Sequence, residues 1–204
     1  MNSTPKIWVI PFDDKRLTPK TVQYLNQQER AKAQNFFHQR DQKNYQLSHI
    51  YLREILTLYS PTLSPKDWRF KFNRYGKPFI ANQGYQDIYF NISHTKTHFA
   101  MIISDRVCGI DIEQEGSIEI DQNILDFVLT QKEQKIIREK NISFYTIWTL
   151  KEAHLKAKGS GLSTPLHEIE FLSIEESSIF KRGEYYYKTQ QIEDGISLSW
   201  AVIA

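Results

Sequence analysis

The sequence predicts an α+β fold built from two similar lobes, an intramolecular pseudo-dimer. A strand followed by two helices and then by further strands occurs twice along the 204 residues. The triplet Leu52–Glu54 (LRE) in the second helix of the first half is echoed by Leu150–Glu152 (LKE) in the second half. We therefore expect an internal repeat, with an N-terminal lobe over residues 1–97 and a C-terminal lobe over residues 98–204. A cleft between two such lobes is a natural ligand site.

The first half alternates between strand and helix signals. Thr18 followed by Pro19 has the form of a helix N-cap with proline in the first turn. Residues 68–72 alternate with period two, which is typical of a strand. In chain order we expect a strand at 7–10, a helix from 19, polar helical sequence at 27–32, a helix spanning 45–59, strands at 68–72 and 88–92, and a turn at 73–78 between these two strands.

The second half begins with two apolar stretches separated by a short polar turn. Residues 99–103 and 107–113 flank Asp105 and Arg106, so we predict a hairpin. Helical sequence follows at about 121–139 and 143–158, and alternating strands are expected near 169–171, 185–187 and 197–202.

Composition narrows the class of protein. The chain is 40% hydrophobic and 25% charged with a net charge of +2, which does not predict the basic face of a nucleic-acid binder. The single cysteine, Cys108, cannot form an intrachain disulfide, which favours a reducing compartment. Neither a secretory leader nor a run of about 18 apolar residues is evident. We expect a cytoplasmic protein without a nucleic-acid or membrane partner.

Three acidic residues are the main candidates for chemistry. Asp111 and Glu113 are two apart on a strand, so their side chains share a face, while Glu152 lies on a later helix. Oxygen ligands without nearby cysteine or histidine favour a hard cation, and such carboxylates suit magnesium beside a phosphate. The alternative at this stage is that the Asp-x-Glu strand simply faces solvent.

A lysine and a serine–histidine pair add candidates for anion binding. Glu152 and Lys156 are four apart on one helix face, which is either an ordinary surface pair or the border of a site. Ser93 and His94 follow a strand, and because no third partner is indicated we reject a hydrolase triad and expect phosphate binding. Three further lysines are either anion ligands or solvated side chains: Lys32, Lys77 and Lys151.

Two blocks of sequence carry a resemblance to a known family. Gly109–Glu113 (GIDIE) and Trp148–Lys156 (WTLKEAHLK) resemble the paired signature of the 4′-phosphopantetheinyl transferase superfamily, a Gly-x-Asp block followed by a W-[ST]-x-K-E-x-x-x-K block. Asp111 and Glu152 are 41 positions apart (152 minus 111), as that pattern asks. Tyr75–Pro78 and Phe90–His94 look like upstream blocks of the larger, pseudo-dimeric Sfp-type branch. The resemblance covers residues 28–166.

The resemblance implies both a reaction and a metal site. Members transfer the 4′-phosphopantetheine group from coenzyme A to a serine of an apo acyl or peptidyl carrier protein, leaving adenosine 3′,5′-bisphosphate. By position, Asp111, Glu113 and Glu152 match the Mg²⁺ ligands (with Mn²⁺ as a substitute), and Lys156 matches the lysine beside the leaving group. Either Glu152 or Glu133 matches the general base, and the sequence leaves that choice open.

The same resemblance implies coenzyme A contacts. Lys77 and Pro78 match residues around the adenine and the 3′-phosphate, whereas Ser93 and His94 match phosphate contacts. Lys32 and Lys151 complete the expected coenzyme A contacts, and Tyr145 with segment 159–165 is expected to meet the carrier protein. Glu29 departs from the family, because some relatives have a basic residue there.

The resemblance also bears on assembly and on the carrier protein. The length of the chain and its N-terminal half argue against the trimeric short branch, so the resemblance implies a monomer. The carrier protein is left open among those of fatty-acid, polyketide, nonribosomal-peptide and lysine biosynthesis.

Two other functions stay open from the sequence. One is a protein that binds coenzyme A or its carrier without catalysis, and the intact Glu152–Lys156 pair argues against it. The other is a metal-dependent phosphohydrolase, in which water replaces the carrier serine.

Overall fold

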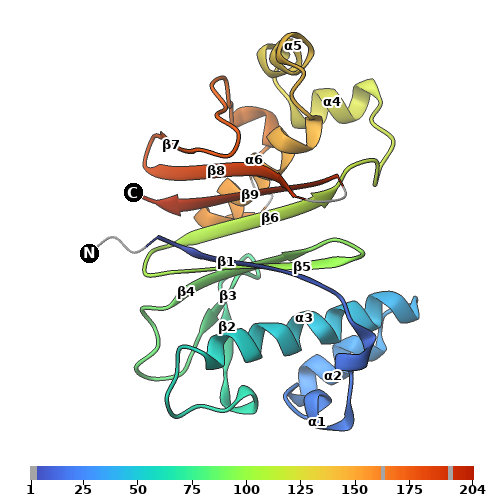
Figure 1. The fold of residues 1–204 in the computed structure, drawn as a ribbon, viewed down its shortest axis with the longest axis vertical. Coiled ribbons are helices and arrows are strands. Elements are labelled where there is room, and N and C mark those ends of the chain that lie inside the picture. Colours follow the sequence, from blue (N-terminus) through green and yellow to red (C-terminus); the bar gives the residue numbers. More distant parts are fainter. Residues whose placement is uncertain (1–3, 162–163, 193–194) are drawn as a thin grey trace.

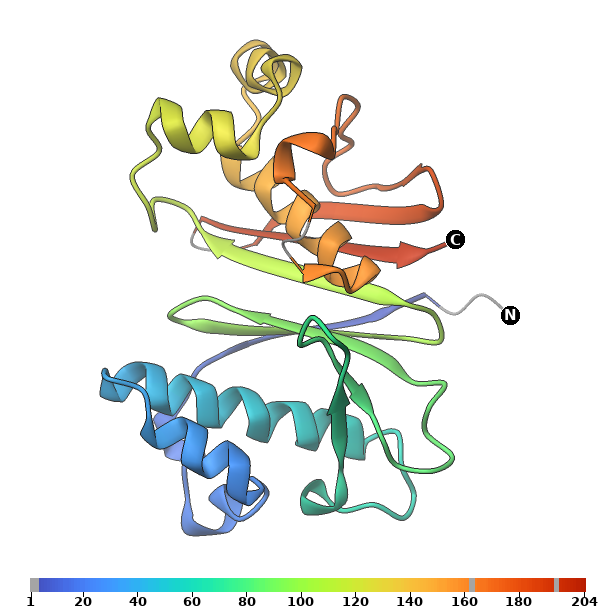
Figure 2. The same ribbon diagram turned by 180° about the vertical axis from the view of Figure 1, so that it is seen from behind.

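The computed structural model describes residues 4–161, 164–192 and 195–204, which form two lobes stacked along the long axis (Figure 1). The two sheets lie against one another at the centre, and the helices cover their outer faces (Figures 1 and 2). This confirms the two-lobed α+β fold predicted from the sequence.

The N-terminal lobe contains a three-stranded antiparallel sheet and its covering helices. Its sheet has the order β1-β5-β4. A short β2–β3 hairpin extends from the lobe beside it. The elements are β1 (Lys6–Pro11), η1 (Asp14–Arg16), α1 (Pro19–Val22), α2 (Gln27–Gln34), α3 (Gln39–Thr57), η2 (Pro65–Asp67), β2 (Phe70–Phe72), β3 (Pro78–Ile80), β4 (Tyr89–His94) and β5 (His98–Ser104).

The C-terminal lobe repeats this arrangement. Its antiparallel sheet has the order β6-β9-β8-β7, so that β6, β9 and β8 correspond to β1, β5 and β4 of the first lobe. The elements are β6 (Cys108–Gln114), α4 (Gln122–Val128), α5 (Gln131–Lys140), α6 (Phe144–Lys158), η4 (Leu166–Glu168), β7 (Ile179–Arg182), β8 (Tyr185–Ile192) and β9 (Ile196–Ile203).

Three hydrophobic cores hold the layers together. One lies between α3 and the N-terminal sheet, and a second lies between α6 and the C-terminal sheet. The third joins the two sheets and includes Ile102 of β5, Ile110 and Ile112 of β6, and Leu198 of β9. The inner faces of both sheets are therefore buried against each other, which fixes the lobes as neighbours.

A buried ion pair is repeated in the two lobes. In the first lobe Glu29, at position N3 of the capping box of α2, is bonded through both carboxylate oxygens to Arg53 of α3 at 2.8 Å. In the second lobe Glu133, at N3 of the capping box of α5, is 2.5 Å from Lys151 of α6. Arg53 and Lys151 are the middle residues of the two echoed triplets, so the repeat seen in the sequence has a structural counterpart.

One prediction about strand pairing was wrong. Strands β5 and β6 do not form a hairpin, because β5 pairs with β1 and β4 whereas β6 pairs with β9. The lobe boundary expected between residues 97 and 98 therefore falls inside the β4–β5 hairpin. Sheet pairing places that boundary after Ser104.

Two further elements differ from the sequence-based expectation. The helix expected over 121–139 is divided into α4 and α5, because Leu129 has extended backbone angles and Thr130 begins a new helix as its N-cap. No strand forms at 169–171, where Ile169 and Phe171 are buried in the core of the C-terminal lobe.

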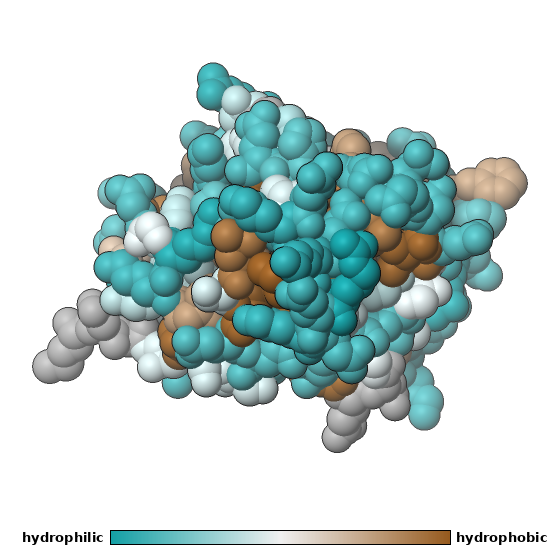
Figure 3. Space-filling view, turned by 90° about the horizontal axis from the view of Figure 1, so that it is seen from above, coloured by the Kyte–Doolittle hydropathy of each residue, from teal (hydrophilic) through white to brown (hydrophobic). Residues whose placement is uncertain are grey.

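The surface at the end of the molecule that carries α4 and α5 is mainly hydrophilic, with hydrophobic patches between the polar side chains (Figure 3). Within the described ranges, no helix combines the length and the apolar character needed to cross a membrane.

Candidate active site

A cleft of about 630 Å³ lies between the lobes and brings together most of the predicted site residues. Strand β4 and helices α2 and α3 form its N-terminal wall, and β6 and α6 form its C-terminal wall. The lining residues are Lys32, Phe36, Tyr45, Ser48, His49, Ile92, Ser93, His94, Asp111, Glu113, Trp148, Glu152 and Lys156.

The alternation of β6 aims its acids at α6. Ile110 and Ile112 point into the core between the sheets, so Asp111 and Glu113 lie on the opposite face of the strand. Gly109 shares that face and lets α6 approach closely, since an added Cβ would lie 2.2 Å from the carbonyl oxygen of Ala153. The glycine of the GIDIE block is therefore required by the packing that forms the site.

Asp111 is the centre of the polar contacts in the cleft. It is 2% exposed, and its Oδ1 accepts hydrogen bonds from Ser93 Oγ at 2.9 Å and from Lys156 Nζ at 2.5 Å. Lys156 Nζ also donates to Ser93 Oγ at 2.9 Å, which joins the two lobes. Asp111 Oδ2 is buried without a hydrogen-bond partner among the described residues. One oxygen of a buried carboxylate is thus left for another ligand.

Negative charge is crowded around Asp111. Burial, and after it the nearby charge of Asp111, raise the pKa of Glu113 to about 7. Burial and Asp111 likewise raise the pKa of Glu152. Carboxylates that disfavour one another's charge in this way are stabilised when a cation joins them.

The three carboxylates of the cleft are not arranged as a complete set of metal ligands in this structure. In the described parts of the chain, no three side chains of His, Cys, Asp or Glu are arranged so that they could bind one metal ion. The position against Asp111 Oδ1 is held by the Lys156 ammonium instead.

Aromatic and basic side chains form the N-terminal wall. Lys32 Nζ lies 5.4 Å above the ring of Tyr45, and that ring is 4.4 Å from the ring of His49. Burial, together with the charge of Lys156, lowers the pKa of His94, so its imidazole is neutral near pH 7. This wall offers one lysine and a neutral histidine to an anionic ligand.

Glu133 and Lys151 lie away from the cleft. Both side chains are fully buried and bonded to each other. Glu133 also accepts from the backbone N–H groups of Thr130 and Phe171 at 2.8 Å, and Lys151 Nζ donates to the carbonyl of Val128 at 2.6 Å. Their hydrogen-bonding capacity is used within the C-terminal lobe.

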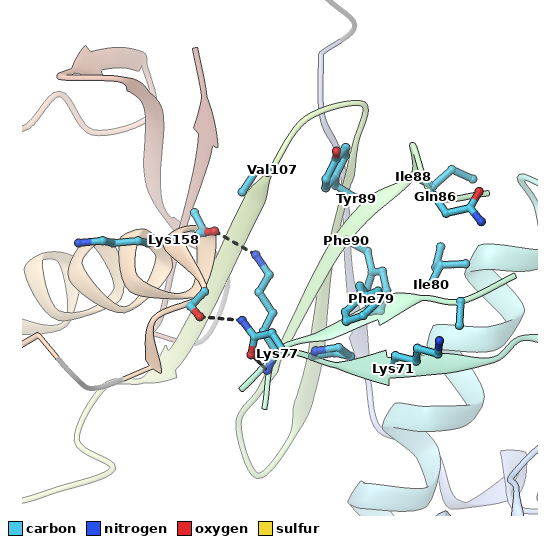
Figure 4. Close-up of a pocket in the computed structure, with 15 residues that line it drawn as sticks. Lys71, Lys77, Phe79, Ile80, Gln86, Ile88, Tyr89, Phe90, Val107 and Lys158 are labelled. Carbon is cyan, nitrogen blue, oxygen red and sulfur yellow. Dashed lines mark hydrogen bonds between the residues drawn. The ribbon is translucent and has the colours of Figure 1, made fainter. Parts of the chain in front are cut away.

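Lys77 and Pro78 lie beside the cleft rather than in it. They line two adjoining hollows of about 250 and 560 Å³, and the smaller one shares Glu152 and Lys156 with the cleft. Lys77 Nζ donates to the backbone carbonyls of Cys108 and Ala157. Figure 4 shows the Lys77 side chain extending toward the end of α6.

The expected carrier-contact residues are only partly accessible in this structure. Tyr145 is 4% exposed, and its hydroxyl group is close to the backbone of Ile118. Of segment 159–165, residues 162 and 163 lie outside the described residues.

Six cleft residues were not singled out from the sequence as site residues: Phe36, Tyr45, Ser48, His49, Ile92 and Trp148. Tyr45 and His49 are four apart on α3, which places both on one face of that helix. That spacing was the available signal, but it is equally typical of a helix packed on a core.

Comparisons with known proteins account for nearly the whole chain. A sequence model described as the N-terminal part of 4′-phosphopantetheinyl transferase matches residues 14–106, and a model of the 4′-phosphopantetheinyl transferase superfamily matches residues 107–201. The chain belongs to the 4′-phosphopantetheinyl transferase superfamily. It is a transferase of the two-lobed, Sfp-type branch, and the division between the matches agrees with the lobe boundary after Ser104.

Individual relatives of the chain are also named 4′-phosphopantetheinyl transferase. The chain is 27% identical over 188 residues to 4′-phosphopantetheinyl transferase Sfp of Bacillus subtilis, covering 87% of this chain and 82% of Sfp. It is 36% identical over 101 residues to 4′-phosphopantetheinyl transferase gsp of Aneurinibacillus migulanus, covering 48% of this chain and 41% of gsp. It is 27% identical over 172 residues to 4′-phosphopantetheinyl transferase HetI of a Nostoc strain, covering 80% of this chain and 72% of HetI. For gsp, therefore, the matched part is less than half of the relative's length.

Proposed function

We propose that this transferase moves the 4′-phosphopantetheine group of coenzyme A to a serine of an apo acyl or peptidyl carrier protein. The products are the holo carrier protein and adenosine 3′,5′-bisphosphate. The single observation that carries the proposal is the convergence of Asp111, Glu113, Glu152 and Lys156 in a cleft between the lobes, with Asp111 Oδ2 buried and unbonded among the described residues.

The donor set suits a magnesium ion. Asp111, Glu113 and Glu152 offer carboxylate oxygens without sulfur or imidazole ligands, which is the preference of Mg²⁺. When bound, Mg²⁺ would neutralise and polarise the pyrophosphate of coenzyme A. The pKa values of Glu113 and Glu152 are raised first by burial and then by the charge of Asp111, and a bound cation would offset both effects.

Three cleft side chains, Lys156, Ser93 and His94, would bind the phosphate groups of coenzyme A. Lys156 carries a positive charge beside Asp111, where it would stabilise the phosphate oxygen of the leaving adenosine bisphosphate. The neutral imidazole of His94 lines the same cleft and would donate a hydrogen bond to a phosphate oxygen. Ser93 Oγ has one proton and would donate to phosphate in place of its bond to Asp111. These groups would orient the diphosphate with one phosphorus atom open to attack.

Proton transfer completes the chemistry. The oxygen of the carrier serine forms a bond to the phosphorus that bears the pantetheine arm, and the bond from that phosphorus to the bridging oxygen breaks. The leaving group keeps the electron pair of that bond. Glu152 would accept the serine proton, because its carboxylate lines the cleft in which the diphosphate would lie. Glu133 is fully buried in a pair with Lys151, which favours Glu152 as the base.

A mass-spectrometric assay tests the proposal. The purified chain is incubated with coenzyme A and a panel of apo carrier proteins, with Mg²⁺ or with a chelator. We expect the carrier to gain the mass of one phosphopantetheine only with Mg²⁺. Asp111→Asn and Glu152→Gln should lower the rate by at least about 100-fold, whereas the exposed control Glu139→Gln should not.

The alternatives have distinct outcomes in the same assay. Binding of coenzyme A by calorimetry without product on any carrier would favour a binding protein. Release of phosphopantetheine without a carrier would indicate a phosphohydrolase. Full activity in both folded carboxylate variants would refute the site.

We further propose that the chain acts as a monomer. Light scattering in the assay buffer would measure its molar mass and check this.

A further inference from the structure

The β2–β3 hairpin of the N-terminal lobe reaches across to the end of α6 in the C-terminal lobe (Figure 4). Asn73 Nδ2 donates to the carbonyl of Gly159 at 2.8 Å. Lys77 Nζ donates to the carbonyl of Ala157 at 3.1 Å and to the carbonyl of Cys108 at 2.9 Å. Two side chains of one turn therefore hold three carbonyls of the other lobe.

The turn itself is ordered by the same asparagine. Asn73 Oδ1 accepts hydrogen bonds from the backbone N–H groups of Tyr75 and Lys77, each at 2.9 Å. The backbone N–H of Asn73 donates to the carbonyl of Lys77 at 3.0 Å, and Gly76 supplies the positive φ of 86° that the turn requires. The amide oxygen of Asn73 thus shapes the turn, while its amide nitrogen contacts α6.

The end of α6 has groups that need such partners. The last carbonyls of a helix lack partners within the helix, and positive charge is favourable there. Gly159 ends α6 in the left-handed conformation with φ of 69°, which turns its carbonyl toward Asn73. An added Cβ at Gly159 would lie 3.1 Å from Asn73 Nδ2 and 3.3 Å from Lys77 Cδ, so the hairpin and the helix end are in close contact.

We propose that Asn73 and Lys77 form a clamp between the lobes that positions the helix carrying Glu152 and Lys156 for transfer. The ammonium of Lys77 thereby serves two carbonyls of the protein rather than a phosphate of the donor. Ala157 directly follows Lys156, and Cys108 lies three residues before Asp111, so the clamp holds both elements that carry the site. The inference rests on the proposed function, because it names residues that position the same catalytic groups.

The test uses three variants of the full chain. Asn73→Asp keeps the oxygen that shapes the turn and replaces the N–H donated to Gly159 by a carboxylate oxygen, which repels that carbonyl. Lys77→Met removes the ammonium and keeps the length of the stem. Lys71→Met, on β2 of the same hairpin and exposed, is the control for loss of a positive charge. Hydrogen–deuterium exchange of residues 153–159 reports on the clamp without needing activity. Kinetics with coenzyme A and with dephospho-coenzyme A report on positioning.

We expect exchange near the end of α6 to rise at least threefold in Asn73→Asp and Lys77→Met but not in Lys71→Met. The kcat of both clamp variants should fall about 10- to 100-fold, equally with the two donors, while KM for coenzyme A changes less than threefold. A merely structural role would leave kcat per folded molecule unchanged, and that result would overturn positioning.

The other outcomes also decide the matter. If Lys77→Met raises KM for coenzyme A but not for dephospho-coenzyme A, Lys77 binds the 3′-phosphate, which only coenzyme A carries. Unchanged hydrogen–deuterium exchange near the end of α6 would show that no clamp exists. If Lys77→Met does not fold, Asn73→Asp gives the same readouts. Absence of transfer by the unmodified chain with every carrier would refute the proposed function and with it the positioning role, whereas exchange would still decide the clamp.

Discussion

Replacing Lys151 by methionine should destabilise the protein strongly, because it leaves the carboxylate of Glu133 buried without its partner. Both side chains have zero exposure, so water cannot replace the lost ammonium. Removing one member of a buried ion pair typically costs about 3–5 kcal/mol. Glu133 keeps two backbone N–H donors, from Thr130 and Phe171, which places the expected loss at the lower end, about 3 kcal/mol.

This loss of about 3 kcal/mol corresponds to a fall in Tm of about 6–12 °C for a chain of this size. Adding Glu133→Gln to Lys151→Met removes the unpaired charge but leaves one of the two backbone N–H donors facing an amide NH2. Stability should therefore recover in part, to within about 2 kcal/mol of the original chain. Urea unfolding and calorimetry measure both changes. The matched control is Lys135→Met, because Lys135 and Glu139 form an exposed pair on α5 and their loss should cost under about 0.5 kcal/mol.

The same variants separate a structural role from a chemical one. If the pair is structural, the double variant should transfer phosphopantetheine within about threefold of the original rate per folded molecule. If Glu133 is the general base, its replacement should lower that rate at least about 100-fold. A single variant with an unchanged Tm, or a double variant no more stable than the single one, would refute the energetic reasoning.

Three further predictions concern the site and its support. Ser93→Ala removes a hydroxyl bonded to both Asp111 and Lys156, and we expect about tenfold slower transfer at unchanged Tm; equal rates would show that this hydroxyl is not used. Gly109→Ala places a methyl group against α6 and should lower the free energy of unfolding by more than about 3 kcal/mol, measured in urea, whereas a wild-type midpoint would show that α6 can move aside. His154→Gln should flatten the pH dependence of stability. Burial and two nearby positive charges lower the pKa of His154 from 6.5 to about 4, so the unfolded chain takes up a proton first and stability falls as the pH drops from about 6.5 to 4. After discounting for partial exposure, we expect about 1–2 kcal/mol less loss in the variant over that window, and parallel curves for the two proteins would contradict this.

The sequence predicted local elements well where the signal was local. The two blocks around Asp111 and Glu152 identified the acids that the cleft brings together, because strand alternation and helix spacing determine the direction of side chains. The capping box at Thr130 and Glu133 was also present in the sequence, and it would have divided the helix expected over 121–139 and indicated a capping role for Glu133.

Long-range pairing was beyond the local signal. The turn at Asp105 and Arg106 between two apolar strands is typical of a hairpin, yet β6 pairs with β9, about ninety positions away along the chain. The pairing of β5 with β1 is equally distant in sequence. The partners of Lys77 could not be predicted either, since carbonyls of Cys108 and Ala157 become neighbours only when the lobes meet.

The repeated architecture of the two lobes bears on binding stoichiometry. In α3 the counterpart of Glu152 is Glu54, which is engaged with Arg16 at 2.6 Å, and β1, the counterpart of β6, carries no acidic residue. The N-terminal half-repeat therefore lacks the oxygen donors that β6 and α6 provide in the C-terminal one. We expect calorimetric titration to count a single coenzyme A for each chain, and two equivalent sites would mean that the lobes are more alike in function than their acids allow.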